Sequence, residues 1–254
     1  MNINPFNKLL KLPTGELHLW LTFPNLIQDP KLLTTYNKLL TKEEQDKKQR
    51  FRFQKHQNQY LITRALIRSI LSRYIALEPN AWQFKKNKYG RPEVITDILP
   101  LRFNLSHTDD LIICGVMLEK DIGVDVEGIN RNNATKDIAT RFFSAQEVLD
   151  LYSEPTNSNF FDYWTLKESY IKARGMGLSL PLHKFTFHIA DNIKISFNSD
   201  LHDDPNKWQF WLLEPTPQHR IAISAHSKMK LNLSMKTTIP LISEQKFTCP
   251  ILKR

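Results

Sequence analysis

The residues from Trp164 to Gly177 constrain this chain more than any other segment, because they combine a helical pattern with reactive side chains. Glu168 and Lys172 are four residues apart, so a helix would place them on one face. Two glycines follow Lys172 within five residues, and glycine commonly ends helices. We therefore predict a helix from Phe160 to Arg174 that carries an acid and a base near its C-terminal end.

A second segment, residues 122–127, predicts a strand with two acids on one side. Asp125 and Glu127 are two positions apart among β-branched residues, so both carboxylates would leave the same face of a strand. The alternating Ile and Val residues would bury the other face, so the acid face would be directed at another group, and we expect Asp125 to be a solvated site acid outside the core. A D-x-E pattern alone is common on solvated strand edges. Together with Glu168, however, the pair could hold a hard divalent cation beside Lys172, which predicts metal-assisted chemistry on a phosphate.

The composition indicates a globular chain. With 254 residues, 41% of them hydrophobic and 24% charged, the chain can bury a sizeable core as one large domain or two small ones. No apolar run approaches the ~20 residues of a membrane span, and residues 1–12 lack the apolar core of a signal peptide. Cys114 and Cys249 are the only cysteines. Two cysteines favour a reducing, cytoplasmic compartment over a disulfide framework.

The net charge of +9 at pH 7 predicts an acidic partner. Nucleic acid, anionic lipid, a phosphorylated cofactor and an acidic protein all satisfy this prediction, and a basic proteome background is the alternative. The basic run from Lys47 to His56 is interleaved with Phe51 and Phe53, as in some RNA-binding surfaces. No RNA-binding or zinc motif accompanies it, so a solvated helix face is the simpler interpretation.

Hydrophobic patterning predicts strand–helix–strand groups that occur twice. We therefore predict an α+β fold of two halves, residues 1–118 and 119–254. The tail from Lys228 is basic and lacks a clear pattern. The predicted strands are 16–23, 101–107, 111–118, 122–126, 185–189, 193–197, 208–213 and 220–225, and the predicted helices include 58–76, 132–143 and 144–152.

Two smaller motifs offer polar groups to a phosphate. Ser106 and His107 are adjacent in a predicted strand, so their side chains point to opposite faces and cannot pair as nucleophile and base. We interpret His107 as a phosphate or hydroxyl contact, with a structural histidine at a strand end as the alternative. The turn from Tyr89 to Pro92 offers one cation and a tight backbone, and Arg91 could grip a phosphate through two N–H groups.

Taken together, these motifs resemble the 4′-phosphopantetheinyl transferase superfamily, in its longer Sfp-like branch. The short, trimeric synthases of that superfamily place their aspartate near the N-terminus, which this chain does not. The resemblance implies two similar α+β halves in a pseudo-two-fold arrangement, each a small antiparallel sheet packed with helices. The matching segments follow in the family's order over residues 40–190 and are Tyr89–Pro92, Phe103–His107, Ile122–Glu127, Arg141–Ser144, Trp164–Lys172 and Gly175–Pro181.

The resemblance implies an enzyme that moves the phosphopantetheine arm of coenzyme A onto a serine of an apo carrier protein, with release of adenosine 3′,5′-bisphosphate. It implies that Asp125, Glu127 and Glu168 are Mg²⁺ ligands in the C-terminal half, and that the N-terminal half contacts the nucleotide. Lysines of the N-terminal half align poorly with the family. The residues expected to bind the cofactor are Tyr89, Gly90, Arg91, Pro92, Ser106, His107 and Lys172, with Lys47 and then Arg64 as the N-terminal candidates.

The implied reaction needs a base, because a serine hydroxyl is a poor nucleophile. Glu168, or a metal-bound water held by Glu127, could take the proton. Mg²⁺ and Lys172 would neutralise the charge that develops on the leaving group. The resemblance also implies a cytoplasmic monomer without membrane association.

Carrier proteins of this type are acidic, so the positive charge of the chain fits electrostatic steering of the carrier. We expect the carrier to dock on the helix at 132–143, beside the acids. The residues expected to contact it are Arg131, Lys136 and Arg141 as cations, and Ile129 and Phe142 as an apolar anchor.

Two other function classes fit some of the same residues. A Mg²⁺-dependent nuclease would use the three acids and the basic run, but nuclease sites of the D…E-x-K type need a lysine two positions after the acid, and that position is Ile129. A non-catalytic relative that only binds coenzyme A or a carrier is disfavoured, because all three acids are present. Nucleic acid is therefore not the expected partner.

Overall fold

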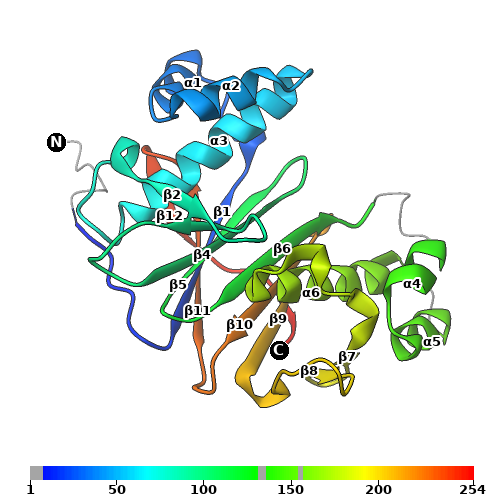
Figure 1. The fold of residues 1–254 in the computed structure, drawn as a ribbon. Helices are drawn as coiled ribbons and strands as arrows, with labels where there is room; N and C mark the ends of the chain where they lie inside the picture. Colours follow the sequence, from blue (N-terminus) through cyan, green and yellow to red (C-terminus); the bar gives the residue numbers. More distant parts are fainter. Residues whose placement is uncertain (1–7, 131–135, 154–156) are drawn as a thin grey trace.

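Two β-sheets form the centre of the computed structural model, which describes residues 8–130, 136–153 and 157–254 (Figure 1). The first sheet has the strand order β12-β11-β1-β5-β4, and the second has the order β13-β9-β10-β6. The strands of the first sheet are β1 (Glu16–Thr22), β4 (Leu101–His107), β5 (Ile112–Leu118), β11 (Asn232–Ile239) and β12 (Ser243–Phe247). Those of the second are β6 (Ile122–Gly128), β9 (Trp208–Thr216), β10 (His219–His226) and β13 (Ile251–Lys253).

Helices and two small hairpins surround the sheets. The hairpins are β2 (Phe84–Lys86) with β3 (Pro92–Val94), and β7 (Phe185–Ile189) with β8 (Ile193–Phe197). The α-helices are α1 (Pro30–Asn37), α2 (Lys42–Gln49), α3 (Gln54–Leu71), α4 (Lys136–Phe142), α5 (Ala145–Ser153) and α6 (Asn157–Arg174).

Each sheet packs one long helix on its outer face and the other sheet on its inner face. Helix α3 shares an apolar core with Trp20 and Phe103 of the first sheet, and α6 shares a second core with Phe210 of the second sheet. A third core lies between the sheets and contains Leu17, Leu19 and other alternate residues of β1. Because strand side chains alternate between faces, β1 serves two cores at once.

The predicted mixed α+β class is confirmed by these sheets and helices. The helix predicted at 58–76 is α3, which begins four residues earlier and ends at Leu71. No helix among residues 8–130, 136–153 and 157–254 is both long and apolar enough to cross a membrane.

The tail from Lys228 is regular in the structure, although its sequence lacks a clear pattern. Strand β11 pairs in parallel with β1 and antiparallel with β12, so residues 232–247 belong to the first sheet. Half of the side chains along β11 are half-buried, and buried and exposed positions do not alternate regularly as in a typical strand. The division into residues 1–118 and 119–254 stays a prediction. Strands β11 and β12 return to the first sheet, whereas the last strand, β13, belongs to the second.

Candidate functional site

The two sheets meet along a seam between their edge strands, β4 and β6. Asn104 Oδ1 of β4 accepts a hydrogen bond from the Val124 N–H of β6 at 2.8 Å. Two residues along, Ser106 Oγ accepts one from the Val126 N–H at 3.4 Å. Side chains of β4 therefore take up edge N–H groups of β6 that would otherwise lack a partner. This seam places Ser106 directly beside Asp125.

The acids of β6 face helix α6. Ile122, Val124 and Val126 are buried between the two sheets, so the intervening residues point to the other face. On that face a Cβ built on Gly123 would lie 1.9 Å from the carbonyl oxygen of Ser169 in α6. Only glycine permits so close a contact, and it brings the helix that carries Glu168 and Lys172 against the strand.

Asp125, Ser106 and Lys172 form a connected group that we call the acid–lysine cluster. Lys172 Nζ lies 2.6 Å from Asp125 Oδ1 and 3.0 Å from Ser106 Oγ. Ser106 donates its own proton to Asp125 Oδ1 at 2.8 Å. Asp125 is only 3% exposed, so the expectation that this acid faces solvent is wrong. Helix α6 covers the face on which it lies.

Glu168 lies one helical turn before Lys172 and interacts with the same cluster. Burial raises the pKa of the Glu168 carboxyl above its ordinary value, and the negative charge of Asp125 raises it further, whereas Lys172 lowers it. The structure thus brings Glu168 near Asp125, as the sequence predicts. Glu127 lies on the same face of β6 as Asp125, two residues along and less buried.

The metal assignment of Asp125, Glu127 and Glu168 stays a prediction. Within the described ranges, no group of three His, Cys, Asp or Glu side chains is arranged to hold a metal ion. The donor set nevertheless suits a hard cation, because Asp125 Oδ2 is buried without a hydrogen-bond partner and carboxylate oxygens are the protein ligands of Mg²⁺. In this structure Lys172 supplies the positive charge at Asp125.

Three residues predicted to bind the cofactor line one cavity of about 590 Å³ between α2, α3 and the end of β4. They are Lys47, Arg64 and His107, and we call this space the cation cavity. The Arg64 guanidinium donates to Glu44 Oε1 at 2.7 Å, and Lys47 Nζ lies 5.5 Å from the centre of the Tyr60 ring. Lys47 and Arg64 were the weakest of the cofactor-binding candidates in the sequence, yet the fold brings both together with His107.

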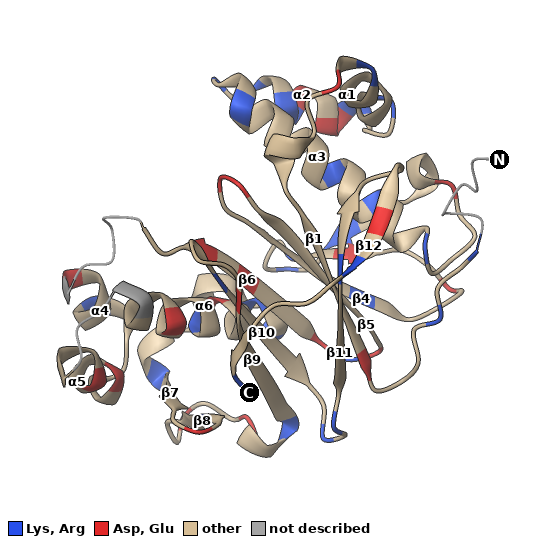
Figure 2. Cartoon of the chain, turned by 180° about the vertical axis from the view of Figure 1, so that it is seen from behind, with Lys and Arg blue, Asp and Glu red and all other residues tan. Residues whose placement is uncertain are grey.

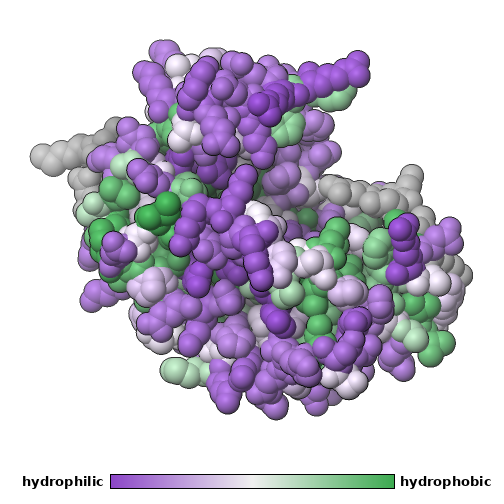
Figure 3. Space-filling model, in the orientation of Figure 1, coloured by the Kyte–Doolittle hydropathy of each residue, from purple (hydrophilic) through white to green (hydrophobic). Residues whose placement is uncertain are grey.

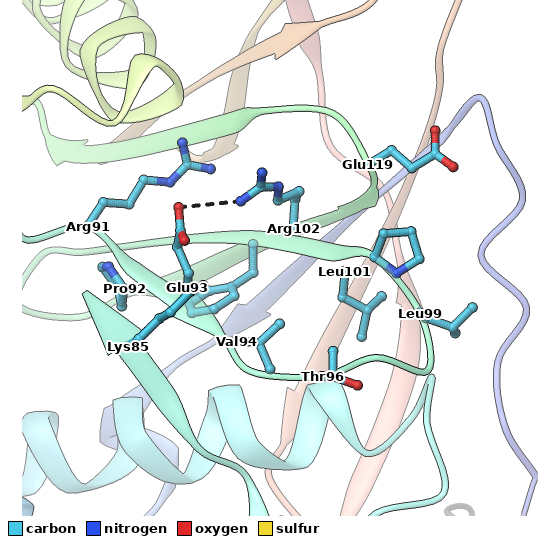
Figure 4. A pocket seen from close by; sticks show the side chains of 12 residues that line it. Lys85, Arg91, Pro92, Glu93, Val94, Thr96, Leu99, Leu101, Arg102 and Glu119 are labelled. Atoms are coloured by element: carbon cyan, nitrogen blue, oxygen red, sulfur yellow. Dashed lines mark hydrogen bonds and ion pairs between the residues drawn. The ribbon is translucent and has the colours of Figure 1, made fainter. Parts of the chain in front are cut away.

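The turn from Tyr89 to Pro92 borders a second cavity, of about 440 Å³, between the β2–β3 hairpin and β4 (Figure 4). Arg91 and Pro92 line it, while Tyr89 is 43% exposed. The side chain of Arg91 is largely buried and already engaged, because Nη1 donates to the carbonyl oxygen of Ala173 at 2.7 Å and to Asp121 Oδ1 at 3.2 Å. The contact between Arg91 and a phosphate of the cofactor stays a prediction.

Comparison with known proteins places these features in a family. The model of the 4′-phosphopantetheinyl transferase superfamily matches residues 121–224, and that of the 4′-phosphopantetheinyl transferase N-terminal region matches residues 29–117. The 4′-phosphopantetheinyl transferase HetI of Nostoc sp. is 35% identical over 176 residues, which cover 67% of this chain and 73% of the relative. The chain belongs to the 4′-phosphopantetheinyl transferase superfamily.

Two Bacillus relatives of the transferase agree with this assignment. The transferase Sfp of Bacillus subtilis is 30% identical over 77% of this chain and 87% of its own length. The transferase psf-1 of Bacillus pumilus is 34% identical over 67% of this chain and 72% of its own length. The predicted Sfp-like branch is therefore confirmed.

Two further residues shape the site, although the sequence carries no signal that predicts this role. Glu44 follows Thr41 by three residues, which is the spacing of a helix-capping box, yet its carboxylate also binds Arg64 and the buried Arg68. Asn87 gave no signal beyond that of a turn residue, yet its side chain reaches the carbonyl oxygen of Gly175 at the end of α6. Both act on partners at least 20 residues away in the sequence.

Proposed function

We propose that this chain transfers the 4′-phosphopantetheine arm of coenzyme A to a serine of an apo acyl or peptidyl carrier protein and releases adenosine 3′,5′-bisphosphate. The acid–lysine cluster beside Glu168 is the observation that carries this proposal. It joins a strand acid, a helix acid and a lysine of the segment that one family model matches to Ser106 of the segment that the other model matches. Acids that could hold a metal ion, together with a lysine, suit attack on a pyrophosphate, because the metal and the lysine offset its negative charge.

In the proposed reaction the serine oxygen of the carrier forms a bond to phosphorus as the bond to the bisphosphate nucleotide breaks. Lys172 offsets the negative charge that develops on the leaving phosphate. Glu168 accepts the proton of the serine hydroxyl. Burial and the charge of Asp125 raise the pKa of Glu168, which makes this carboxylate a better proton acceptor than an exposed one.

Asp125, Glu127 and Glu168 are the residues that we propose to hold Mg²⁺. When bound, this ion supplies positive charge to the pyrophosphate. Asp125 Oδ2, buried without a partner, is the oxygen best suited to reach it. Since Asp125 Oδ1 is already held by Ser106 and Lys172, the free oxygen stays oriented without further ordering of the side chain.

The cation cavity is the proposed site for the phosphorylated nucleotide end of coenzyme A. Lys47 and Arg64 offer fixed positive charge there, and His107 offers a hydrogen bond from its exposed position at the end of β4. The turn of Tyr89, Gly90, Arg91 and Pro92 is the proposed adenine contact. Ser106 and Lys172 lie at the cluster, where the pyrophosphate would reach them.

The proposed protein partner is an acidic carrier that docks beside the acids, on α4. Figure 2 shows that Lys and Arg are spread over both halves of the molecule, so the net charge of +9 would act on the carrier from a distance. Figure 3 shows hydrophilic residues over α1 to α3 and apolar patches over the region of α4 to α6. On α5, Leu149 is 63% exposed and Tyr152 is 48% exposed, which offers apolar area next to α4.

Of the docking residues predicted from the sequence, Arg131 lies outside the described residues. Arg141 is exposed, and its guanidinium carbon lies 5.3 Å from the centre of the Phe142 ring.

We further propose that the transferase is a cytoplasmic monomer. Both cysteines are free, which fits a reducing compartment, where disulfides are rare.

The proposed function is tested by incubating the chain with coenzyme A, Mg²⁺ and a panel of apo carrier proteins. Intact mass spectrometry should show the mass of one phosphopantetheine arm on a carrier, and chelation of Mg²⁺ should abolish the gain. A carrier whose target serine is replaced by alanine is the control. If no carrier in a panel of fatty-acid, polyketide and peptide-synthetase types gains mass, the proposal is wrong.

A further inference from the structure

The β2–β3 hairpin is fastened to the C-terminal end of α6. Asn87 Nδ2 donates to the carbonyl oxygen of Gly175 at 2.9 Å, and Arg91 Nη1 donates to that of Ala173 at 2.7 Å. These carbonyl groups belong to the end of a helix, where no later turn offers an N–H partner. Side chains of the hairpin therefore cap the helix that carries Glu168 and Lys172.

Asn87 also shapes the turn from which Arg91 projects. Its Oδ1 accepts hydrogen bonds from the backbone N–H of Tyr89 at 2.9 Å and from that of Arg91 at 3.0 Å. One amide group thus does two separable things. The oxygen holds the turn in shape, and the nitrogen holds the turn against α6.

Gly175 permits this contact because it has no side chain. A Cβ at Gly175 would lie 2.9 Å from Arg91 Cδ and 3.2 Å from Asn87 Nδ2. Gly177, two residues later, provides a comparison. Both glycines have positive φ, at +63° and +56°, but a Cβ at Gly177 would meet nothing within 4 Å.

We propose that Asn87 is a positioning residue, which holds Lys172 in register with the nucleotide turn through a clamp of Asn87, Arg91 and Gly175. The inference rests on the proposed function, in which one coenzyme A molecule touches both the turn and Lys172. Lys172 is only one residue before Ala173, whose carbonyl oxygen Arg91 binds. A loose clamp would let the turn and the lysine shift relative to each other, and a displacement of about 1 Å can cost roughly a hundredfold in rate.

The first test separates the two parts of the Asn87 amide. Asn87→Asp keeps an acceptor for the turn and removes the donor to Gly175, whereas Asn87→Ala removes both. We expect Asn87→Asp to bind adenosine 3′,5′-bisphosphate about as well as the unaltered chain, by calorimetry, but to lose about tenfold to a hundredfold in kcat for coenzyme A. Asn87→Ala should lose both affinity for the bisphosphate and kcat for coenzyme A. Asn192→Asp, in the exposed β7–β8 turn, controls for the added charge.

The second test approaches the clamp from the helix. Gly175→Ala and Gly177→Ala carry the same backbone cost, because both positions have positive φ. We expect only Gly175→Ala to reproduce the kcat loss of Asn87→Asp. The double variant Asn87→Asp with Gly175→Ala should lose little more than either single one, because both act on one contact.

The outcomes separate this inference from the proposed function. Kinetics of Asn87→Asp within twofold of the unaltered chain, or equal losses in Gly175→Ala and Gly177→Ala, would overturn the clamp alone. Parallel loss of bisphosphate affinity and kcat in Asn87→Asp would also overturn it, because Asn87 would then act only through binding. If the unaltered chain transfers nothing, the proposed function fails and the clamp fails with it.

Discussion

The acid–lysine cluster and the cation cavity contribute to one proposed reaction but are built in opposite ways. In the cluster, Asp125 is 3% exposed and meets Ser106 and Lys172 within 3 Å. The cavity holds about 590 Å³ of open space, its cations Lys47 and Arg64 come from α2 and α3, and His107 lies at the end of β4. The cluster is closed by hydrogen bonds among its own side chains, whereas the cavity leaves room for a ligand.

This difference predicts how each region responds to mutation. In the cluster each group restrains the others, so one substitution disturbs the reacting geometry and should lower kcat. In the cavity each cation contributes separately to an exposed phosphate, so one substitution should raise the KM for coenzyme A and leave kcat nearly unchanged.

Asp125→Asn should give the largest effect. The amide keeps the shape of the carboxylate, but it removes the negative charge that holds Lys172. The same negative charge is the one that we propose to bind Mg²⁺. We expect kcat to fall roughly a thousandfold, about 4 kcal/mol of transition-state stabilisation. Steady-state transfer measured by intact mass gives kcat, and thermal unfolding checks the fold, because Asp125 is a buried residue.

Glu244→Gln is the matched control for Asp125→Asn. Glu244 lies in β12 of the first sheet, outside the cluster. Its carboxylate is paired with Arg73 at 2.9 Å and with Lys236 at 2.8 Å. This variant should lose stability without losing kcat. Near-normal kcat in Asp125→Asn would contradict the view of the cluster as the reacting centre.

His107→Ala tests the cavity and should act on binding. We expect the KM for coenzyme A to rise about tenfold to a hundredfold, the range for a hydrogen bond to a charged group, while the KM for 3′-dephospho-coenzyme A changes little. His188→Ala is the control, because His188 is exposed on the β7–β8 hairpin and bonds to Ser196. Equal losses for both substrates would remove His107 from the proposed phosphate contact.

Glu44→Gln tests whether the cavity depends on its supporting contacts. Burial raises the pKa of Glu44, but Arg64, the Thr41 N–H and Arg68 together lower it below its ordinary value. A lowered pKa gives stability that is present at neutral pH and is lost as the pH falls through the pKa of the folded state. Glu44→Gln should cost about 2 kcal/mol at pH 7, and the difference from the unaltered chain should shrink in acid.

Urea unfolding between pH 3 and pH 7 measures this difference, and the KM for coenzyme A should rise because Arg64 loses its anchor. Glu43→Gln, on the exposed side of the same helix, should change neither quantity. A stability difference that stays constant with pH would show that the charge of Glu44 contributes nothing.

Local sequence signals predicted the cluster better than the cavity. Spacing of two in a strand and four in a helix put Asp125, Glu127, Glu168 and Lys172 on the expected faces, because those periods depend only on neighbouring residues. Burial of Asp125 was not predictable in this way. It follows from the approach of α6 to Gly123, which is a contact between residues 46 positions apart.

Contacts between distant parts of the chain account for the other features of the structure that the sequence did not predict. Asn87 and Gly175 are 88 residues apart, and neither carries a pattern that indicates the other. Strand β11 was hidden because it pairs with β1, more than 200 residues earlier. Lys47 and Arg64 come together only because Glu44 ties α2 to α3. Sequence periodicity predicts which residues share one face of a helix or strand. Which of these faces pack against each other depends on the whole fold.

The smallest effect is expected at the carrier surface, which belongs to neither region. Arg141→Glu, alone and together with Lys136→Glu, should raise the KM for an acidic carrier by about threefold to tenfold at low salt, because charges at the rim of an interface act mainly on association. The effect should fade as salt rises, since exposed charges are screened over ~10 Å at ~0.1 M ionic strength. The KM for coenzyme A should stay constant, which would separate this surface from the cation cavity.

Lys194→Glu is the control, because it reverses the charge of an exposed residue on β8, away from α4 in the sequence. If Arg141→Glu and Lys194→Glu change the KM for carrier equally at every salt concentration, only net charge matters and the carrier docks away from α4.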